Sequence, residues 1–247
     1  MTDICQALGP IRSYWSEPVT APTPRSAVPT PSFQTTTIAN GNTGTFTVTL
    51  MPHQAGDYLV VFLALKNATL IDVPAGWAAV RENSTGGVWL GTYQQSTLAA
   101  SSSETNPVFT IHSSGNGTGE AHPYSIPITG GSILRAHVNG TSGTSTSADP
   151  PSLTPFGGTQ DYLWFALAGV SGNTSISAGP SGYSNFTASS NSTSVTLGTA
   201  WKQSTAATTE NPGAFTNSSA NWVANTFAVW DTAPVIARVP TNMLLGV

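Results

Sequence analysis

The same short motifs occur twice in the chain in the same order, and this repetition constrains the fold more than any other feature. Asp57-Tyr58-Leu59 in the first half matches Asp161-Tyr162-Leu163 in the second half. The turn sequence Pro-Ala-Gly-Trp at 74–77 matches Pro-Ser-Gly-Tyr at 180–183. The offset stays at about 105 residues, a length at which a repeat is one structural unit or a small domain.

Further matches define the extent of the two units. The run Val88–Thr92 parallels Val195–Thr199, whereas upstream Leu50-Met51-Pro52 shares only a Leu and a Pro with Leu153-Thr154-Pro155. The match is therefore weakest at the start of each unit. The units are predicted at about 32–130 and about 131–230, which together form one duplicated body over 32–230.

Between the chain ends, short runs rich in Val, Ile, Thr and aromatic residues alternate with turns of Gly, Asn, Ser and Pro. No stretch keeps the 3.6-residue apolar period of a helix. We therefore predict an all-β fold, an antiparallel β-sandwich that is jelly-roll-like and built from the two repeats. Strands are expected near 33–38, 43–49, 57–65, 77–82, 86–95, 106–112, 122–128, 132–138, 160–169, 182–187, 193–202, 212–217 and 221–230.

Two architectures are compatible with this pattern. In the preferred one, the two units interleave in a single sandwich about a pseudo-two-fold axis, and in the other they form two tandem Ig-like sandwiches. The Gly/Ser/Thr run at 140–147, which leads to Pro150-Pro151, is predicted to be one long loop.

The two ends of the chain differ from the body and are predicted to be extended arms. Residues 1–31 hold the densest proline cluster, which favours a polyproline-like conformation. Residues 231–247 are more apolar than a solvated tail should be. The residues predicted to bind partners are Trp15, Pro22, Pro24, Val235, Ile236, Met243, Leu244 and Leu245.

Composition excludes several classes of partner. Only 7% of residues are charged, and Lys and Arg number 7 against 11 Asp and Glu, so no basic face for nucleic acid is expected. The start of the chain lacks the pattern of a signal peptide, and the longest apolar run, 58–65, is too short to span a bilayer as a helix. The single Cys5 allows no intrachain disulfide. No membrane association is predicted.

The sequence assembles no recognisable catalytic, cofactor or metal site. Asp57 and Asp161 are predicted to fix a shared turn geometry by accepting hydrogen bonds from local backbone N–H groups. Glu120 and His122 face the same way on a strand, but two ligands do not make a metal site. A serine nucleophile elbow, Gly-x-Ser-x-Gly, is absent from the sequence. The protein is therefore predicted not to be an enzyme, and no cofactor is expected.

Aromatic residues offer two interpretations. Exposed Trp and Tyr rings can stack on flat ligands or anchor interfaces, while buried rings fill the core. Core packing is the preferred prediction for Trp77, Trp89, Tyr93, Trp201 and Trp222.

The order of three segments, 56–64, 74–77 and 86–93, resembles β-rich accessory virion proteins of tailed bacteriophages, and the resemblance covers about residues 50–230. It implies a non-enzymatic component of the virion, such as a capsid decoration (cement) protein or a tail protein. Expected partners are other virion subunits, the major capsid or tail protein, and the chain itself as a homo-oligomer. Two alternatives remain: a carbohydrate-binding or host-receptor-binding adhesin module, and a surface hydrolase.

Overall fold

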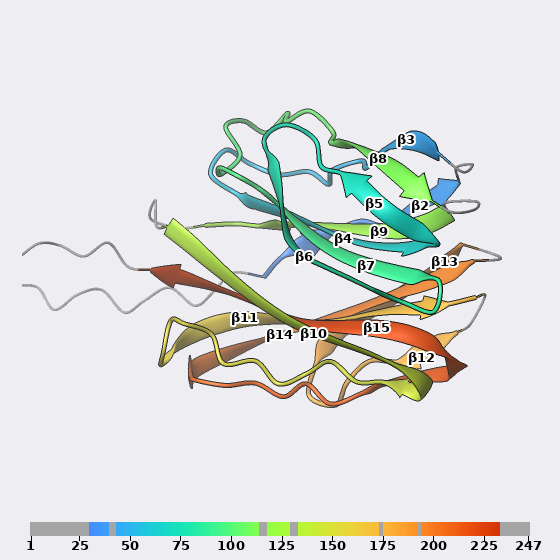
Figure 1. Ribbon diagram of the computed structural model, residues 1–247. Coiled ribbons are helices and arrows are strands. Elements are labelled where there is room, and N and C mark those ends of the chain that lie inside the picture. The colour runs from blue at the N-terminus through green and yellow to red at the C-terminus, as the bar shows by residue number, and fades with distance from the viewer. Residues whose placement is uncertain are drawn as a thin grey trace, which may run out of the picture.

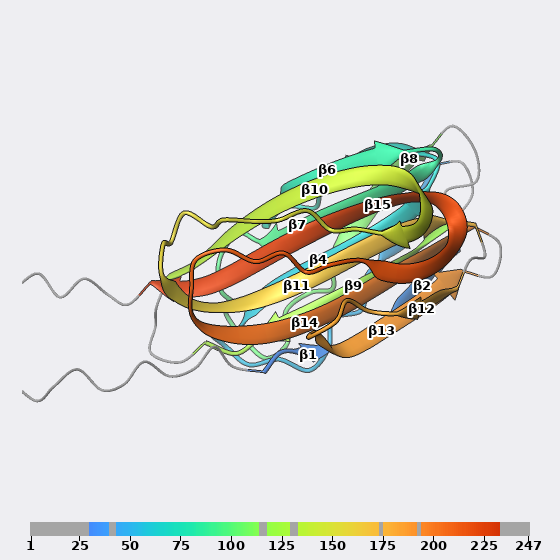
Figure 2. The ribbon, with the colours of Figure 1, turned by 90° about the horizontal axis from the view of Figure 1, so that it is seen from below.

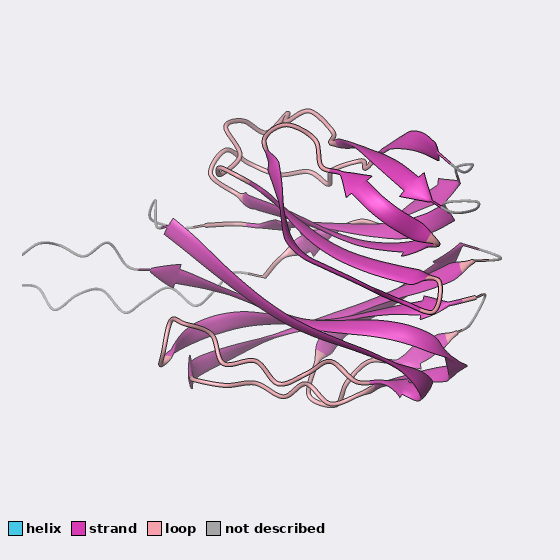
Figure 3. Ribbon diagram, in the orientation of Figure 1, coloured by secondary structure: helices cyan, strands magenta, loops and turns pink. Residues whose placement is uncertain are grey.

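The described part of the chain consists of β-strands joined by turns and loops. A computed structural model describes residues 30–39, 43–113, 118–128, 133–172, 175–191 and 194–232 (Figure 1). Every pair of strands in it is antiparallel. Figure 3 shows no helix among these residues, and hence none that could span a membrane. The prediction of an all-β antiparallel fold is confirmed.

The first sheet takes its strands from the first half of the chain. Its order is β1-β9-β4-β7-β6, and β2 also pairs with β9. The strands are β1 (Ser32–Phe33), β2 (Thr36–Ala39), β4 (Tyr58–Lys66), β6 (Trp77–Thr85), β7 (Val88–Gln95) and β9 (Thr118–Ile126).

The second sheet takes its strands from the second half of the chain. Its order is β10-β15-β11-β14-β13, and β12 also pairs with β15. The long strands β10 and β15 lie side by side over almost their whole length (Figure 2). The strands are β10 (Ile133–Ala148), β11 (Gln160–Ser171), β12 (Ile176–Ala178), β13 (Ser184–Asn191), β14 (Val195–Ala207) and β15 (Phe215–Thr232).

A third, smaller sheet covers the outer face of the first. It has the order β3-β8-β5, with β3 (Thr43–Thr47), β8 (Val108–Ser113) and β5 (Ala68–Asp72). Figure 1 shows this sheet above the first sheet, and the second sheet below. Because β4 is buried on both faces, it reads as a continuous apolar run rather than as an alternating one.

The main core lies between the first and second sheets. Phe62 of β4 is at its centre, with its ring centroid 5.2 Å from that of Phe165 and 5.6 Å from that of Phe227, both in the second sheet. All three side chains are fully buried. The other face of β4 points to the third sheet, where Leu63 packs in one cluster with Phe109. The two halves of the chain are therefore joined by one continuous hydrophobic core.

The two halves do not interleave in the described residues. Neither inner sheet contains a strand of the other half, so the prediction of an interleaved sandwich is wrong. The strand order β9-β4-β7-β6 nevertheless parallels β15-β11-β14-β13. Across the core, β6 contacts β10, β4 contacts β11, and β2 contacts β13. The halves are thus two layered units packed face to face.

One sequence match between the halves corresponds to the same local structure. The N–H of Trp77 donates to the Pro74 carbonyl (3.1 Å), and that of Tyr183 donates to the Pro180 carbonyl (3.2 Å). The third turn residues, Gly76 and Gly182, have φ values of 82° and 78°. Both are type II turns, in which this position needs positive φ and hence glycine.

The match at Asp57-Tyr58-Leu59, in contrast, is out of structural register. Tyr58 packs in the main core between the two inner sheets, whereas Tyr162 packs on the outer face of the second sheet and Leu163 takes the inner position. The pairing of β11 with β14 shifts register between Gln160 and Tyr162. A shift of one residue moves every side chain to the opposite face of a strand.

Three expectations about the boundaries of elements are corrected. The run 140–147, predicted as a loop, continues β10, and Gly143 pairs with Trp222 of β15. A Cβ at Gly143 would lie 2.6 Å from the Trp222 ring, so glycine allows this close packing. Strands β5 and β12 were not predicted. The predicted C-terminal arm at 231–247 begins too early, because β15 extends through Thr232.

Candidate functional site

The predicted partner-binding residues fall at the two ends of the chain. Trp15, Pro22 and Pro24 precede residue 30, while Val235, Ile236, Met243, Leu244 and Leu245 follow residue 232, so all lie outside the described residues. They stay a prediction.

The two matched aspartates have different partners. Asp57 is buried, and its Oδ2 accepts hydrogen bonds from the Gln54 N–H (2.8 Å) and the Ser125 hydroxyl (2.7 Å). Asp161 accepts a hydrogen bond from the N–H of Ala206 on the neighbouring strand (3.0 Å). Local turn geometry therefore describes Asp57 but not Asp161, as the register shift in β11 leads one to expect.

His122 lies in a buried polar layer between the inner sheets. Its Nδ1 is 2.9 Å from the Thr199 hydroxyl, and its Nε2 is 2.7 Å from the Ser189 hydroxyl. Tyr124 OH is 2.7 Å from the same Thr199 oxygen. Burial lowers the pKa of His122 to about 3, so the imidazole is neutral. These contacts connect β9 of the first half to β13 and β14 of the second.

A second polar layer lies on the other side of β4 and β11. Asn83 of β6 donates through Nδ2 to Oδ1 of the fully buried Asn225 on β15 (3.0 Å). Arg81 donates through Nε to Asn83 Oδ1 (2.8 Å). This layer connects β6 to β15 in the same way as the His122 layer connects β13 to β9, and both lie inside an otherwise apolar interface.

Neither buried layer gathers metal ligands. Glu120 is also fully buried on β9, two residues before His122. Across the ranges that the structure describes, no three His, Cys, Asp or Glu residues lie close enough together to hold a metal ion.

The aromatic residues considered as ligand platforms pack mainly inside the protein. Tyr93 is fully buried, and Trp201 and Trp222 are 8% and 7% exposed. Trp77 and Trp89 are half-buried and pack against the core under the third sheet. The preferred prediction of core packing is confirmed for the first three.

The most exposed large apolar side chain in the described residues lies elsewhere, on the loop between β10 and β11. Phe156 is 87% exposed. It belongs to the segment Asp149–Thr159, called the Phe156 loop below, which crosses the outer face of the second sheet. Phe156 is not among the site residues predicted from the sequence. Its signal was an aromatic residue between Pro155 and the pair Gly157-Gly158 in a loop.

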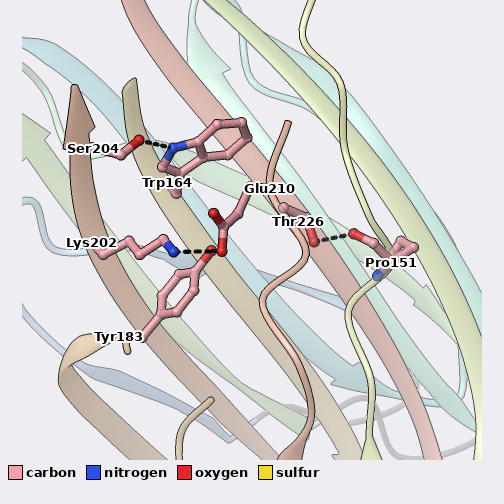
Figure 4. A network of polar contacts seen from close by, with 7 residues as sticks. All are labelled: Pro151, Trp164, Tyr183, Lys202, Ser204, Glu210 and Thr226. Atoms are coloured by element: carbon pink, nitrogen blue, oxygen red, sulfur yellow. Dashed lines mark hydrogen bonds and ion pairs between the residues drawn. The ribbon is translucent and has the colours of Figure 1, made fainter. Parts of the chain in front are cut away.

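The first part of the Phe156 loop is tied to the sheet and to a neighbouring segment (Figure 4). The Thr226 hydroxyl of β15 donates to the Pro151 carbonyl (2.5 Å). Leu153 exchanges two backbone hydrogen bonds with Glu210, of 2.8 Å and 3.0 Å. Leu153 itself is buried among Tyr162, Trp164 and Trp230. The loop is therefore anchored by both backbone and side chain.

Glu210 is fixed in turn by an ion pair with the sheet. Lys202 Nζ of β14 lies 2.6 Å from Glu210 Oε1 and 5.0 Å from the centre of the Tyr183 ring (Figure 4). Tyr183 OH donates to the same carboxylate oxygen at 3.5 Å. Burial first, and then the Glu210 charge, raise the pKa of Tyr183 well above its ordinary value. Beside them, Trp164 Nε1 donates to Ser204 Oγ (2.7 Å).

The far part of the Phe156 loop is fixed by its glycines. Tyr162 OH donates to the Gly158 carbonyl (2.7 Å), and Gln160 Nε2 donates to the Gly157 carbonyl (3.0 Å). A Cβ at Gly157 would lie 2.6 Å from Trp230 Nε1, so the backbone lies directly against this ring. Contacts on both sides of Phe156 therefore hold its backbone in place.

His137 of β10 supports the Phe156 ring. The two rings are stacked, with centroids 4.3 Å apart and planes inclined by 24°. Burial lowers the pKa of His137, and this outweighs the opposing effect of a hydrogen bond with the Thr154 backbone. The stacked pair is accordingly neutral near pH 7.

The first half of the chain has a polar pocket of about 320 Å³. It is lined by residues of the β4–β5 turn and the β6–β7 hairpin, chiefly Asn67, Thr69, Ser84 and Thr85. These supply hydroxyl and amide groups and no charge.

Comparison with protein-family models, with curated proteins and with solved structures finds no match.

Proposed function

We propose that this protein is a non-enzymatic structural component of a phage virion, most simply a capsid decoration (cement) protein attached through its arms. The observation that carries the proposal is where the first and last described strands, β1 and β15, begin and end on the body. In Figures 1 and 2, β1 begins and β15 ends toward the same end of the molecule. The segments 1–29 and 233–247 therefore start where both can reach one neighbouring surface.

The body supports this role because extensive contacts join its two halves. A common core joins the two layers, and polar contacts cross it on both sides of β4 and β11. Two arms on one body gain affinity by binding at two points, since the second contact becomes intramolecular. Expected partners are the major capsid or tail protein and further copies of this chain.

We also propose that the body is a duplicated, jelly-roll-like sandwich. Three features support a duplication: the matching strand orders of the two inner sheets, the type II turn at the same place in each half, and the two polar layers. Each half has an inner sheet and a smaller set of strands further from the main core. In the first half this set is β3-β8-β5, and in the second half it is β12 with the neighbouring ends of β10 and β15.

The test measures how a variant without the two arms binds to phage particles from which this protein is missing. Residues 30–232 alone should bind at least about tenfold more weakly than the full chain, because both attachment points are lost. Variants lacking one arm should fall between. Undiminished binding of 30–232 in a co-sedimentation assay would refute attachment through the arms.

A carbohydrate-binding adhesin is the second candidate, favoured by the neutral polar pocket around Asn67 and Ser84. Hydroxyl and amide groups can hydrogen-bond to sugar hydroxyls, although no aromatic residue lines this pocket. The test is a glycan array. Binding that is lost in Thr69→Val and retained in the distant Ser142→Ala would support the candidate, and a blank array would remove it.

A further inference from the structure

Phe156 has the properties of an interface anchor rather than of a chance exposed residue. It is 87% exposed, against 52% for Leu70, the next most exposed large apolar side chain in the described ranges. Its backbone is held by the contacts of Gly157, Gly158 and Leu153. An aromatic side chain that is already fixed loses little entropy on binding, and such residues dominate interface energies.

The surroundings of Phe156 suit an apolar partner. One face of its ring is stacked on His137, which is neutral near pH 7, and the other parts of the ring are open to solvent. Ring and imidazole together therefore form an uncharged platform, to which a charged peptide would gain little by binding.

The chain itself supplies an apolar segment that begins beside this platform. Trp230, which lies against Gly157, is two residues before Thr232, the last residue of β15. The following segment, 233–247, contains a single charged residue, Arg238. Its apolar residues are those predicted to bind partners.

The end of β15 points out of the body rather than back across the second sheet, as Figure 1 shows. In the sequence that follows, Pro234 favours an extended backbone at Ala233. A 15-residue segment spans at most about 50 Å, enough to reach an adjacent molecule.

We propose that the Phe156–His137 platform binds the C-terminal segment 233–247 of a second copy of this chain. Each copy then gives one segment and receives one, a head-to-tail contact that closes into a ring or continues along a surface. The proposal deepens the proposed function and rests on it, since it identifies one of the partners of the C-terminal arm.

Cysteine cross-linking of the full-length protein tests this contact. In a Cys5→Ser background, one variant carries Thr154→Cys, at an exposed residue beside the platform that leaves Phe156 and His137 in place, and a second carries Ile236→Cys. When the two are mixed and oxidised, we expect disulfide-linked pairs made of one molecule of each variant. The matched control replaces Thr154→Cys by Leu70→Cys, an exposed site on β5, and should give no such pairs.

Two outcomes would overturn the proposal. One is the absence of mixed pairs. The other is a cross-linked monomer formed by the double variant Thr154→Cys, Ile236→Cys at high dilution, which would mean that the segment folds back on its own platform.

Self-association gives a second measurement that needs no cross-link. Phe156→Ala should weaken self-association in analytical ultracentrifugation by about tenfold or more, the effect of losing an aromatic anchor. Leu70→Ala should leave it unchanged. Equal association of Phe156→Ala and the parent protein would contradict the proposal.

The two proposals fail in distinguishable ways, because these experiments contain no phage particle. Mixed cross-links without binding to particles would retain the contact between copies and refute the virion role. Binding to particles without mixed cross-links would retain the virion role and refute the contact between copies.

Discussion

The segments that precede the central strands of the two inner sheets present opposite residues to solvent. Leu50 and Pro52 match Leu153 and Pro155, and the next residue is His53 in the first half and Phe156 in the second. His53 is 6% exposed, whereas Phe156 is 87% exposed. The polar ring is buried and the apolar ring is open, the reverse of what the hydrophobic effect alone would give.

The surroundings of His53 and Phe156 differ because the chain takes a different course after β7 than after β14. In the first half, β7 ends at Gln95 and the chain folds back, so that Gly56 donates to the Ala99 carbonyl and Ala99 donates to the Asp57 carbonyl. Glu104 then donates its N–H to His53 Nε2 (3.3 Å). In the second half, β14 continues to Ala207, and Phe156 stays exposed. The same scaffold thus closes one site and keeps the other open.

The largest effect tests whether the two halves are one cooperative body. Phe62→Ala should lower the free energy of unfolding by about 3–5 kcal/mol, because a buried ring that contacts both sheets is lost. Denaturant unfolding should remain a single transition, as it does for the parent protein. Two separate transitions, with only the first shifted, would mean that the halves fold independently.

The two polar layers should differ in their response to acid. The folded-state pKa of His122 is about 3, below its ordinary value of 6.5, so between these values the unfolded chain binds a proton that the folded protein excludes. His122 thus destabilises the fold as pH falls below 6.5, by about 2 kcal/mol at pH 5, and has no such effect above 6.5. Urea unfolding at several pH values measures this.

His122→Asn copies the residue type of the Asn225 layer and should flatten this pH dependence. The control is Glu120→Gln, which removes the other titratable group on this face of β9 and keeps His122. An unchanged pH profile in His122→Asn would show that another group causes the acid sensitivity.

Substitution of Gly140 tests the contact of the second polar layer. A Cβ there would lie 2.0 Å from Asn83 Nδ2 and 2.1 Å from Asn225 Oδ1. Gly140→Ala should therefore separate these amides and cost about 1–2 kcal/mol of unfolding free energy. Ser142→Ala, on an exposed position of the same strand, is the control. Equal stabilities of the two variants would argue against a structural role for this layer.

The smallest effects compare His53 and Phe156 directly. His53→Ala should lower the free energy of unfolding by about 1 kcal/mol, since its ring bonds to Met51 and Glu104 are lost. Phe156→Ala should change it by less than about 0.5 kcal/mol, because the side chain is exposed. Thermal unfolding of dilute protein measures both. A larger loss for Phe156→Ala would indicate a folding role for this ring.

Apolar pattern predicted the central strands well, because β4 and β11 are buried on both faces and read as continuous apolar runs. It failed for β5, an edge strand with mostly exposed side chains, and for 140–147, whose strand depends on pairing with β15. Tyr58 and Tyr162 match in sequence but point to opposite faces of their sheets. The irregularity in the pairing of β11 that causes this cannot be recognised by comparing residue types.

The candidate site was harder to predict than the fold. The sequence shows Phe156 in a loop, but its exposure depends on whether a distant segment covers it, as Glu104 covers His53. The arms, by contrast, are predicted from composition alone and lie outside the described residues.

The pairing of β15 also has a mechanical consequence. A pull on the C-terminal end along β15 acts on a strand paired with β10 from Ile133 to Ala148, with its hydrogen bonds across the pulling direction. These bonds carry the load together, in shear. β1 pairs with β9 through two residues, Ser32 and Phe33, followed by one hydrogen bond from the Gln34 N–H to the Pro123 carbonyl. Under a pulling force, we therefore expect β1 to separate from its sheet before β15 does.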